Sequence, residues 1–357
     1  MNERATIRAM VAGTLDGFDA ATVEAWLSTV AAVQPPFVWG QLAGGHSNLT
    51  YSIRDCAGRE LVIRRPPLGH LLPKAHDMGR EYRIIEALWP TDVPVPQPVA
   101  YCDDRAVAET HFYVMGRCSG RALHSASSVA DWLDVSARHR AADQLVKVLA
   151  ALHRIEPDAI GLGDLGRPTG YAARQIRTWH SSWESQIENA GYDDSRAHEL
   201  HTVLLAQMPA EGATRVVHGD FGPHNALFRQ TGEISAILDW EIATLGDPLA
   251  DLAYVVNAWV GPNDELLDLR NPPTHLPGFP DRQQIIDRYV ELVGFDMGNL
   301  AYYRVFSFWR RACILQGVYG RYRTGQKSSK GVDMDGILTR ISTLLEAAVD
   351  LVEKDLR

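Results

Sequence analysis

Apolar residues recur at two spacings along the chain, and the change of spacing divides it into two parts. In the first part, short strand-like runs alternate with helical stretches whose apolar residues recur every three or four positions. Strands are expected at 37–43, 49–54, 60–65 and 111–115, and helices at 20–31 and 73–89. The segment 93–99 (VPVPQPV) is expected to be an extended connection, because a proline disfavours helix at the residue before it.

From residue 117 onward the helical spacing dominates. Helices are expected within 138–155, 171–208, 249–260, 282–294, 300–322 and 334–355, and short strands at 216–217, 226–228 and 234–238. The sequence therefore predicts an α+β fold with two lobes. Residues 1–116 would form a small lobe around an antiparallel sheet, and residues 117–357 a larger, mostly helical lobe. Gly116 and Gly120 are the expected hinge. A length of 357 residues agrees with two domains of about 100–200 residues each.

Composition and charge exclude several classes of protein. The chain is 46% apolar and 22% charged, its net charge is −9, and no long basic run is present, so a nucleic-acid partner is not expected. No run of 18 apolar residues exists, which argues against a membrane partner. The four cysteines form no CxxC pair, and the first residues do not resemble a signal peptide. We therefore expect a cytoplasmic protein.

The densest polar signal is HGDFGPHN at 218–225, followed by ILDWE at 237–241. Asp220 follows a short apolar strand, Asn225 starts the next strand, and Asp239 ends the strand that returns after a turn at 230–232. Such a hairpin would bring Asn225 and Asp239 together beside the Asp220 loop. Carboxylate and amide oxygens suit Mg²⁺, which in turn binds polyphosphates.

The motif HGD-x4-N followed by a DxE-type strand resembles the catalytic and metal-binding segments of the aminoglycoside phosphotransferase and choline-kinase family. These proteins are small-molecule kinases related in fold to protein kinases. Other matching segments are GGHSNLTY (44–51), LVIR (61–64), REY (80–82) and GDPLAD (246–251), all in the family's order. With FWRRACILQGVYGRY, they look most like one branch: the kinase-like domain linked to long acyl-CoA dehydrogenases and its stand-alone bacterial relatives.

The resemblance implies a protein-kinase-like bilobal fold and Mg²⁺-dependent transfer of the γ-phosphate of ATP or GTP to a hydroxyl of a small molecule. Asp220 would accept or orient the proton of that hydroxyl, and Asn225 and Asp239 would hold the metal ion. On the nucleotide side, Val62 would cover the adenine, Arg64 would reach the phosphates, and Glu81 would orient Arg64. The full set of expected nucleotide-binding residues is Gly44, Gly45, His46, Ser47, Asn48, Val62, Arg64, Glu81 and Met115.

Two positions depart from the family pattern. Arg64 stands where relatives carry a strand lysine, so the charge is kept but the geometry differs. Gly222 stands where many relatives carry histidine. Three further residues are expected to be structural: His153, at the end of an apolar helix, and His218 as buried histidines, and Asp251 as a brace for the catalytic loop.

Other functions stay open at this point. Histidines and aspartates at 218, 220, 224 and 239 would suit a metallophosphoesterase, although its partner segments are missing. The Arg64 departure would suit a catalytically inactive nucleotide-binding module, and the family also includes antibiotic kinases. The aromatic helix at 307–323 carries Phe308 and Arg311 and lacks acidic residues, which favours an apolar acceptor with an anionic group, such as a hydroxyacyl thioester.

Overall fold

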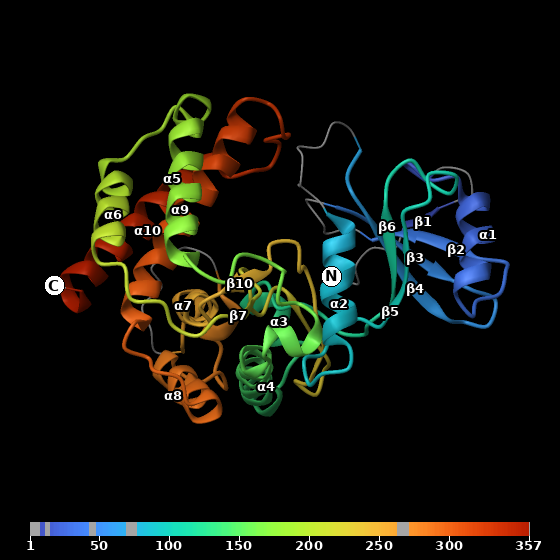
Figure 1. Cartoon of the computed structure of the whole chain (residues 1–357), viewed down its shortest axis with the longest axis horizontal. Coiled ribbons are helices and arrows are strands. Elements are labelled where there is room, and N and C mark those ends of the chain that lie inside the picture. The colour runs from blue at the N-terminus through green and yellow to red at the C-terminus, as the bar shows by residue number, and fades with distance from the viewer. Residues whose placement is uncertain (1–7, 11–14, 43–47, 69–76, 263–270, 357) are drawn as a thin grey trace. The chain divides into compact units, whose positions relative to one another are not determined.

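The computed structural model describes residues 8–10, 15–42, 48–68, 77–262 and 271–356. The chain forms two compact units (Figure 1). Unit 1 is Met1–Gly120 with Ser235–Glu241, and unit 2 is Arg121–Ile234 with Ile242–Arg357. The short segment 235–241, which ends in the DWE motif, therefore belongs to the unit that is otherwise formed by the first third of the chain.

Unit 1 is built on a six-stranded antiparallel sheet in the order β1-β2-β3-β4-β6-β5. The strands are β1 (Arg8–Met10), β2 (Val38–Gln41), β3 (Leu49–Arg54), β4 (Glu60–Arg65), β5 (Pro98–Cys102) and β6 (Phe112–Gly116). Two helices accompany the sheet, α1 (Ala20–Val30) and α2 (Met78–Leu88). Each helix is capped by an aspartate, Asp19 or Asp77, whose side chain accepts a backbone N–H of the first turn.

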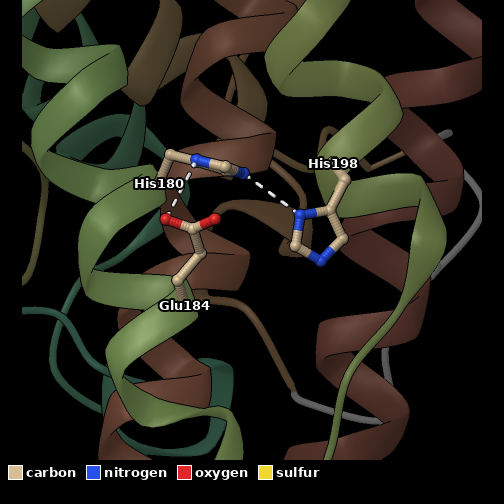
Figure 2. A group of neighbouring side chains, drawn as sticks. All are labelled: His180, Glu184 and His198. Atoms are coloured by element: carbon tan, nitrogen blue, oxygen red, sulfur yellow. Dashed lines mark hydrogen bonds and ion pairs between the residues drawn. The ribbon is translucent and has the colours of Figure 1, made fainter.

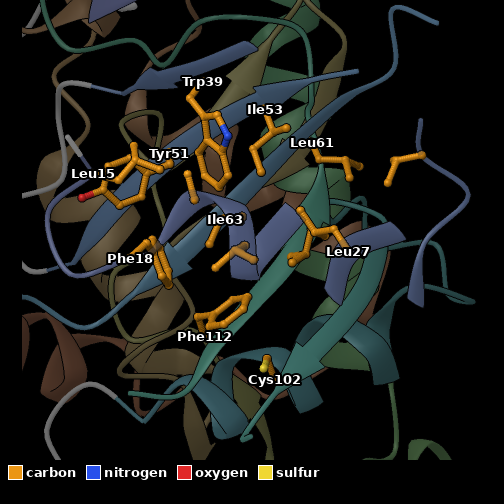
Figure 3. Packing of buried hydrophobic residues seen from close by; sticks show 14 residues of the cluster. Leu15, Phe18, Leu27, Trp39, Tyr51, Ile53, Leu61, Ile63, Cys102 and Phe112 are labelled. Atoms are coloured by element: carbon orange, nitrogen blue, oxygen red, sulfur yellow. The ribbon is translucent and has the colours of Figure 1, made fainter. Parts of the chain in front are cut away.

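The core of unit 1 lies on one side of the central strands (Figure 3). Because side chains alternate along a strand, Tyr51 and Ile53 of β3 share this face with Leu61 and Ile63 of β4. Leu27 of α1 packs into the same cluster, and all five residues are buried. The alternate residues of β4 are Val62 and Arg64, so the strand offers them to its opposite face, as its sequence predicts.

The helix at 20–31 and the strands at 49–54 and 60–65 are confirmed to within a residue. The expectation that 93–99 is only a connection is wrong at its end, because β5 begins at Pro98 and pairs with β6. The sequence analysis also missed β1, which has three residues, too few to show an alternating pattern.

Unit 2 consists mainly of helices, with a few short strands. The helices are α3 (Ala126–Ala130), α4 (Val135–Arg154), α5 (Tyr171–Ala190), α6 (Ser195–Ala206), α7 (Leu249–Ala258), α8 (Arg282–Val293), α9 (Leu300–Arg323) and α10 (Met334–Asp355), with short 3-10 helices at Pro157–Ile160 and Pro273–His275. β7 (Arg215–Val217) pairs antiparallel with β10 (Thr244–Gly246). β8 (Ala226–Phe228) follows the 218–225 loop, and β9 (Ile234–Ile237) crosses the boundary of the two units.

Helix α9 forms the centre of unit 2, where it packs against α5, α7 and α10. Its Phe306 and Trp309 are buried. The predicted helical stretch 171–208 is two helices: α5 ends at Gly191, which adopts φ +57°, and Asp194 caps the start of α6. No helix in the described ranges combines the length and the apolar character needed to cross a membrane.

Candidate active site

The loop between β7 and β8 carries the HGD motif and is fixed by a buried carboxylate. Asp251 of α7 is 1% exposed and accepts the backbone N–H groups of His218 (2.6 Å) and Gly219 (2.8 Å). Arg310 of α9 donates to the carbonyl of Gly219 at 3.0 Å. Gly219 adopts φ +83°, a conformation that favours glycine. The expectation that Asp251 braces this loop is confirmed.

The two histidines interpreted as structural lie in the interior. His153 is completely buried between Tyr289, whose hydroxyl lies 2.7 Å from Nδ1, and Asp251, whose Oδ2 lies 3.5 Å from Nε2. His218 is also completely buried, and its Nδ1 accepts the backbone N–H of Asp220 at 3.2 Å. Both histidines therefore support the loop that presents Asp220.

Asp220 and Asn225 are held together within the loop. The Nδ2 of Asn225 donates to the carboxylate Oδ2 of Asp220 at 3.0 Å and to its backbone oxygen at 2.9 Å. Because both of these bonds use the amide nitrogen, Oδ1 is the atom of Asn225 that could ligate a cation. The side chain of Asp220 is one-third exposed, so it is accessible to a ligand.

Two neighbours keep Asp220 ionised. Nε2 of His224 lies 3.2 Å from its Oδ1. Burial alone would raise the pKa of Asp220, but the hydrogen bonds of His224 and Tyr254 and the charge of His224 lower it to about 2. Asp220 is thus a hydrogen-bond acceptor across the physiological pH range and a weak base.

Gly222 lies next to the ring of His224. A Cβ atom there would lie 2.8 Å from Cε1 of His224, closer than such atoms approach. The ring of His224 therefore occupies the space next to Gly222 and reaches Asp220 from a position two residues later than the family histidine. The sequence analysis noted the missing histidine but did not recognise His224 as the residue that supports Asp220.

A second polar cluster lies in unit 1 around Arg64 of β4. Its Nε lies 3.0 Å from Oε2 of Glu81 on α2, and its Nη2 lies 2.6 Å from Oδ1 of Asp239. Oε2 of Glu241 lies 3.7 Å from the same Nη2. One guanidinium is thus surrounded by three carboxylates, which leaves a local excess of negative charge that a divalent cation would neutralise.

Arg64, Glu81, Asp239 and Glu241 form what we call the carboxylate cluster. Two further residues, Asn48 and Tyr113, donate hydrogen bonds to it. Asn48, 4% exposed, donates to Oε1 of Glu81 (3.3 Å) and to Oε2 of Glu241 (3.2 Å). The Tyr113 hydroxyl donates to Oε2 of Glu81 at 2.9 Å. Burial raises the pKa of Glu81 to about 7, against the opposing effect of Arg64 and Tyr113.

Asp239 has an unusual backbone. Its φ is +68°, in the left-handed region that non-glycine residues seldom adopt. A backbone of this kind costs of order 1–3 kcal/mol and is retained where the surroundings impose it, often at functional sites. The ion pair with Arg64 is one such constraint, and the sequence predicted neither the conformation nor its cost.

The described residues bring together Asn48, Arg64, Glu81 and Asp239 from the predicted nucleotide and metal sites. Val62 and Met115 lie directly opposite one another on β4 and β6, and both are buried. The remaining predicted phosphate-loop residues, Gly44, Gly45, His46 and Ser47, lie outside the described residues. Asn225 and Asp239 fall in different units, so their joint binding of a metal ion stays a prediction.

The oxygen donors in both units have the chemistry that Mg²⁺ requires. Carboxylates are available from Asp220 in unit 2 and from Asp239 and Glu241 in unit 1, with the amide oxygen of Asn225. Mg²⁺ prefers such hard oxygen ligands and is usually bound through one or two carboxylates and substrate phosphates. The residue types therefore fit this ion.

Unit 2 contains a cavity of about 680 Å³ next to the HGD loop. Asp220, His224 and Tyr254 form part of its wall, and Phe308 supplies apolar surface. This volume lies within the range of about 300–1,000 Å³ that is usual for small-molecule pockets. The cavity therefore offers Asp220 to a bound small molecule.

The charged side chains of this cavity are mostly cationic. Among the described residues, five lysines or arginines line it, with two aspartates: Arg282, Arg304, Arg311, Arg340 and Lys354, with Asp220 and Asp350. Burial and the charge of Arg282 lower the pKa of Arg304. The cavity is thus suited to a ligand with negative charge. Of these cations, the sequence analysis had named only Arg311.

Other residues missed by the sequence analysis are Glu241, Tyr113 and Tyr254. Glu241 lay in the quoted ILDWE motif, so its position two residues after Asp239 was a usable signal. Tyr113 lies opposite Arg64 in the β4–β6 register, which a correct strand pairing would have indicated. Tyr254 comes from α7, more than thirty residues after Asp220, and no local pattern points to it.

Known proteins resemble this chain over most of its length. A family model described as "Phosphotransferase enzyme family" matches residues 38–272. Acyl-CoA dehydrogenase family member 10 of Mus musculus is 36% identical over 319 residues, which cover 88% of this chain and 29% of that protein. The chain thus spans less than a third of that relative, and 40% of the human acyl-CoA dehydrogenase family member 11, to which it is 31% identical.

Solved structures share the fold. A provisionally named aminoglycoside phosphotransferase of Ralstonia eutropha has a TM-score of 0.78 and 31% identity, with 94% of this chain and 99% of that chain covered. Aminoglycoside phosphotransferase APH(4)-Ia, solved with AMP-PNP and hygromycin B, has a TM-score of 0.61 and 16% identity, covering 93% and 98%. The predicted α+β, protein-kinase-like fold is confirmed.

Proposed function

The chain belongs to the phosphotransferase enzyme family, and from this premise we propose that it transfers the γ-phosphoryl group of ATP or GTP to a hydroxyl of a small molecule in a Mg²⁺-dependent reaction. The resemblance to the kinase-like domain of long acyl-CoA dehydrogenases is confirmed by the mouse relative. The observation that carries the proposal is Asp220, an ionised carboxylate fixed by its loop and open to a cavity of small-molecule size.

In this reaction the acceptor hydroxyl oxygen would form a bond to the γ-phosphorus while the bond from that phosphorus to the β–γ bridging oxygen breaks. The hydroxyl proton would pass to Asp220. Because the pKa of Asp220 is about 2, its main contribution would be to orient the hydroxyl and to receive the proton late in the transfer. This fits phosphoryl transfer, whose loose transition state depends more on positioning and charge than on a strong base.

The nucleotide would be bound through the groups of unit 1. Val62 and Met115, paired across β4 and β6, would contact the base. Arg64, held by Glu81, would contact the phosphates, and its fork of donors can bind a phosphate oxygen pair. Bound Mg²⁺ would neutralise the phosphate charge, with Asp239 and Asn225 as its protein ligands. A neighbour of this fold is solved with AMP-PNP, which is consistent with ATP as the donor.

For the acceptor, we propose a hydroxylated metabolite with an anionic part, such as a hydroxyacyl thioester. Phe308 provides apolar surface for an acyl chain, and Arg304 and Arg311 provide cations for phosphate or carboxylate groups. An aminoglycoside carries several positive charges, which this cavity would repel. The cationic wall therefore disfavours an antibiotic kinase.

The geometry also weakens the case for a metallophosphoesterase and for an inactive nucleotide-binding module. A metallophosphoesterase would need His218 as a ligand, but His218 is completely buried and its Nδ1 accepts a backbone N–H. The inactive module was suggested by Arg64, yet Arg64 makes the ion pair with Glu81 that the active arrangement requires.

The test is a screen for ADP or GDP release with hydroxyl-bearing acceptors, among them hydroxyacyl-CoA thioesters, neutral alcohols and kanamycin. We expect turnover with an anionic acceptor, and a loss of about 10²–10⁴-fold in kcat for Asp220→Ala with nucleotide affinity retained. Asp287→Ala, which changes an exposed aspartate of α8, is the matched control and should keep the parental rate.

Parental turnover by Asp220→Ala would refute the assignment of the catalytic residue. Strong phosphorylation of kanamycin with none of the anionic acceptors would refute the acceptor class but not the reaction. Binding of Mg-ATP without transfer to any acceptor would favour the inactive module.

A further inference from the structure

A cluster of polar side chains joins α5 to α6 and has no place in the proposed reaction. His180 and Glu184 lie one turn apart on α5, and His198 lies on α6. Figure 2 shows the three side chains converging between the two helices. The Nε2 of His180 lies 3.1 Å from Nδ1 of His198, and its Nδ1 lies 3.6 Å from Oε2 of Glu184.

A carboxylate outside this group sets the orientation of His198. Asp193 accepts hydrogen bonds from the Nε2 of His198 and from the Nε1 of buried Trp183, each at 2.9 Å. The proton of His198 is therefore on Nε2, and the lone pair of Nδ1 points toward His180. A carboxylate–histidine pair of this kind commonly orients histidines that bind metals.

The ring of His180 is also held in place. It stacks on His201 of α6 with centroids 3.7 Å apart and planes inclined by 5°. His201 in turn stacks near Trp309, at 6.3 Å. The stacking on His201 therefore fixes the plane of the His180 ring.

We propose that His180, Glu184 and His198 form a site for one divalent transition-metal ion of the zinc type, with water as a further ligand. One ligand atom from each residue lies within 4.8 Å of those of the other two. Tetrahedral ligands at zinc–ligand distances of 2.0–2.2 Å stand about 3.4 Å apart. Glu184 has a side chain that is 56% exposed, so its rotation can close the remaining gap.

The ligand set also determines which ion should bind. Two imidazole nitrogens and one carboxylate suit Zn²⁺, Co²⁺ or Ni²⁺, whereas Mg²⁺ prefers oxygen ligands. The ion would bind Nε2 of His180 and Nδ1 of His198, the proton of His180 would move to its Nδ1, and the ion would connect α5 to α6. This site is independent of the Mg²⁺ that accompanies the nucleotide, because it uses none of the residues assigned to that ion.

The experiment uses the 357-residue chain without a histidine tag and without nucleotide. Co²⁺ is added and its visible d–d absorption is followed, and Zn²⁺ is then added as a competitor. We expect one equivalent of Co²⁺ with the absorption of a nitrogen-ligated ion, loss of that absorption on addition of Zn²⁺, and no effect of excess Mg²⁺. Zn²⁺ should also raise the Tm of the protein.

Variants identify the ligands. His198→Ala and Glu184→Gln should each weaken Co²⁺ binding by at least about tenfold, and Asp193→Asn should weaken it by about 10–100-fold through the orientation of His198. Glu184→Gln changes an exposed side chain and preserves its shape, so it keeps the test valid if His198→Ala does not fold. His139→Ala removes an exposed histidine of α4 and is the matched control, with unchanged binding.

Absence of a Co²⁺ absorption band together with absence of Zn²⁺ binding in equilibrium dialysis would overturn the proposal. The same holds if Glu184→Gln and His198→Ala both bind as tightly as the parent, or if His139→Ala weakens binding as much as they do.

Discussion

The two units present polar groups of opposite charge. In unit 1, three carboxylates surround the single guanidinium of Arg64, so the carboxylate cluster has an excess of negative charge. In unit 2, the described residues that line the cavity at Asp220 include five cations and two aspartates, an excess of positive charge. Under the proposed function, the first environment suits a metal ion bound to a nucleotide, and the second suits an anionic acceptor.

The comparison also shows that the two environments are built differently. The carboxylates of unit 1 are directly paired with Arg64, and breaking this pairing should affect folding as well as nucleotide binding. Among the described contacts of the cavity arginines, Arg282 donates to the carbonyls of Val256 and Trp259, and Arg304 donates to Asn257. We expect a change at the cavity wall to affect acceptor binding more than a change in the carboxylate cluster does.

The largest effect is expected from Arg64→Ala. It leaves Glu81, whose side chain is 2% exposed, without its opposite charge. Removing one partner of a buried ion pair costs about 3–5 kcal/mol, and we expect about 3 kcal/mol because Asp239 remains partly exposed. Urea unfolding at pH 7 measures this change. Arg64→Lys keeps the charge and should lose less than half as much. Equal losses for both variants would show that the guanidinium geometry, and not its charge, holds the cluster together.

The next effect concerns the cavity. Arg311→Gln removes one cation of the wall and should raise the KM for an anionic acceptor by about 10–100-fold, since a hydrogen bond to a charged group contributes about 1.5–3 kcal/mol. The KM for ATP should stay unchanged. Arg321→Glu, an exposed position further along α9, is the control. A parental KM for Arg311→Gln would contradict the role of the cationic wall.

Most of the fold could be predicted because its helices and strands repeat their apolar residues clearly. Residues such as Tyr51 and Ile63 alternate on strands of six residues, whereas the three-residue β1 and β10 carry too few positions for a pattern. The division between α5 and α6 depends on the left-handed backbone at Gly191, which a glycine permits but does not require.

The site was predictable where its members share a motif. Asp220 and Asn225 lie five residues apart, and their contact follows from the loop that both belong to. The supports of Asp220 were harder to find: Tyr254 reaches it from α7, and the cavity cations come from α8, α9 and α10. Their common location depends on how the helices pack, which local spacing does not encode.

A smaller effect is expected from His224→Ala. Without the hydrogen bond of His224, the pKa of Asp220 should rise from about 2 toward its ordinary value of about 3.9. A depressed carboxylate pKa stabilises the folded state above the unfolded pKa, and this stabilisation is lost as the pH falls toward the folded pKa. The variant should therefore lose less stability than the parent between about pH 4 and pH 2. Urea unfolding at pH 7 and at acidic pH measures the difference. Identical pH dependence would show that His224 does not set this pKa.

The smallest effect tests the carboxylate cluster through pH. Burial raises the pKa of Glu81 to about 7, so Glu81 gains a proton as the pH falls through this value and its ion pair with Arg64 weakens. The KM for ATP should then rise a few-fold between pH 8 and pH 6. Glu81→Gln mimics the protonated form, so its KM for ATP should be raised at pH 8 and change little with pH.

The folding stability should depend on pH in the opposite direction. A raised carboxylate pKa favours the folded state below about pH 7, and this contribution falls as the pH rises. Nucleotide affinity and stability of the parent should thus change in opposite directions over the same pH range. If nucleotide affinity and folding stability rise together, or if Glu81→Gln keeps the parental pH dependence, a group other than Glu81 controls the pH dependence of nucleotide binding.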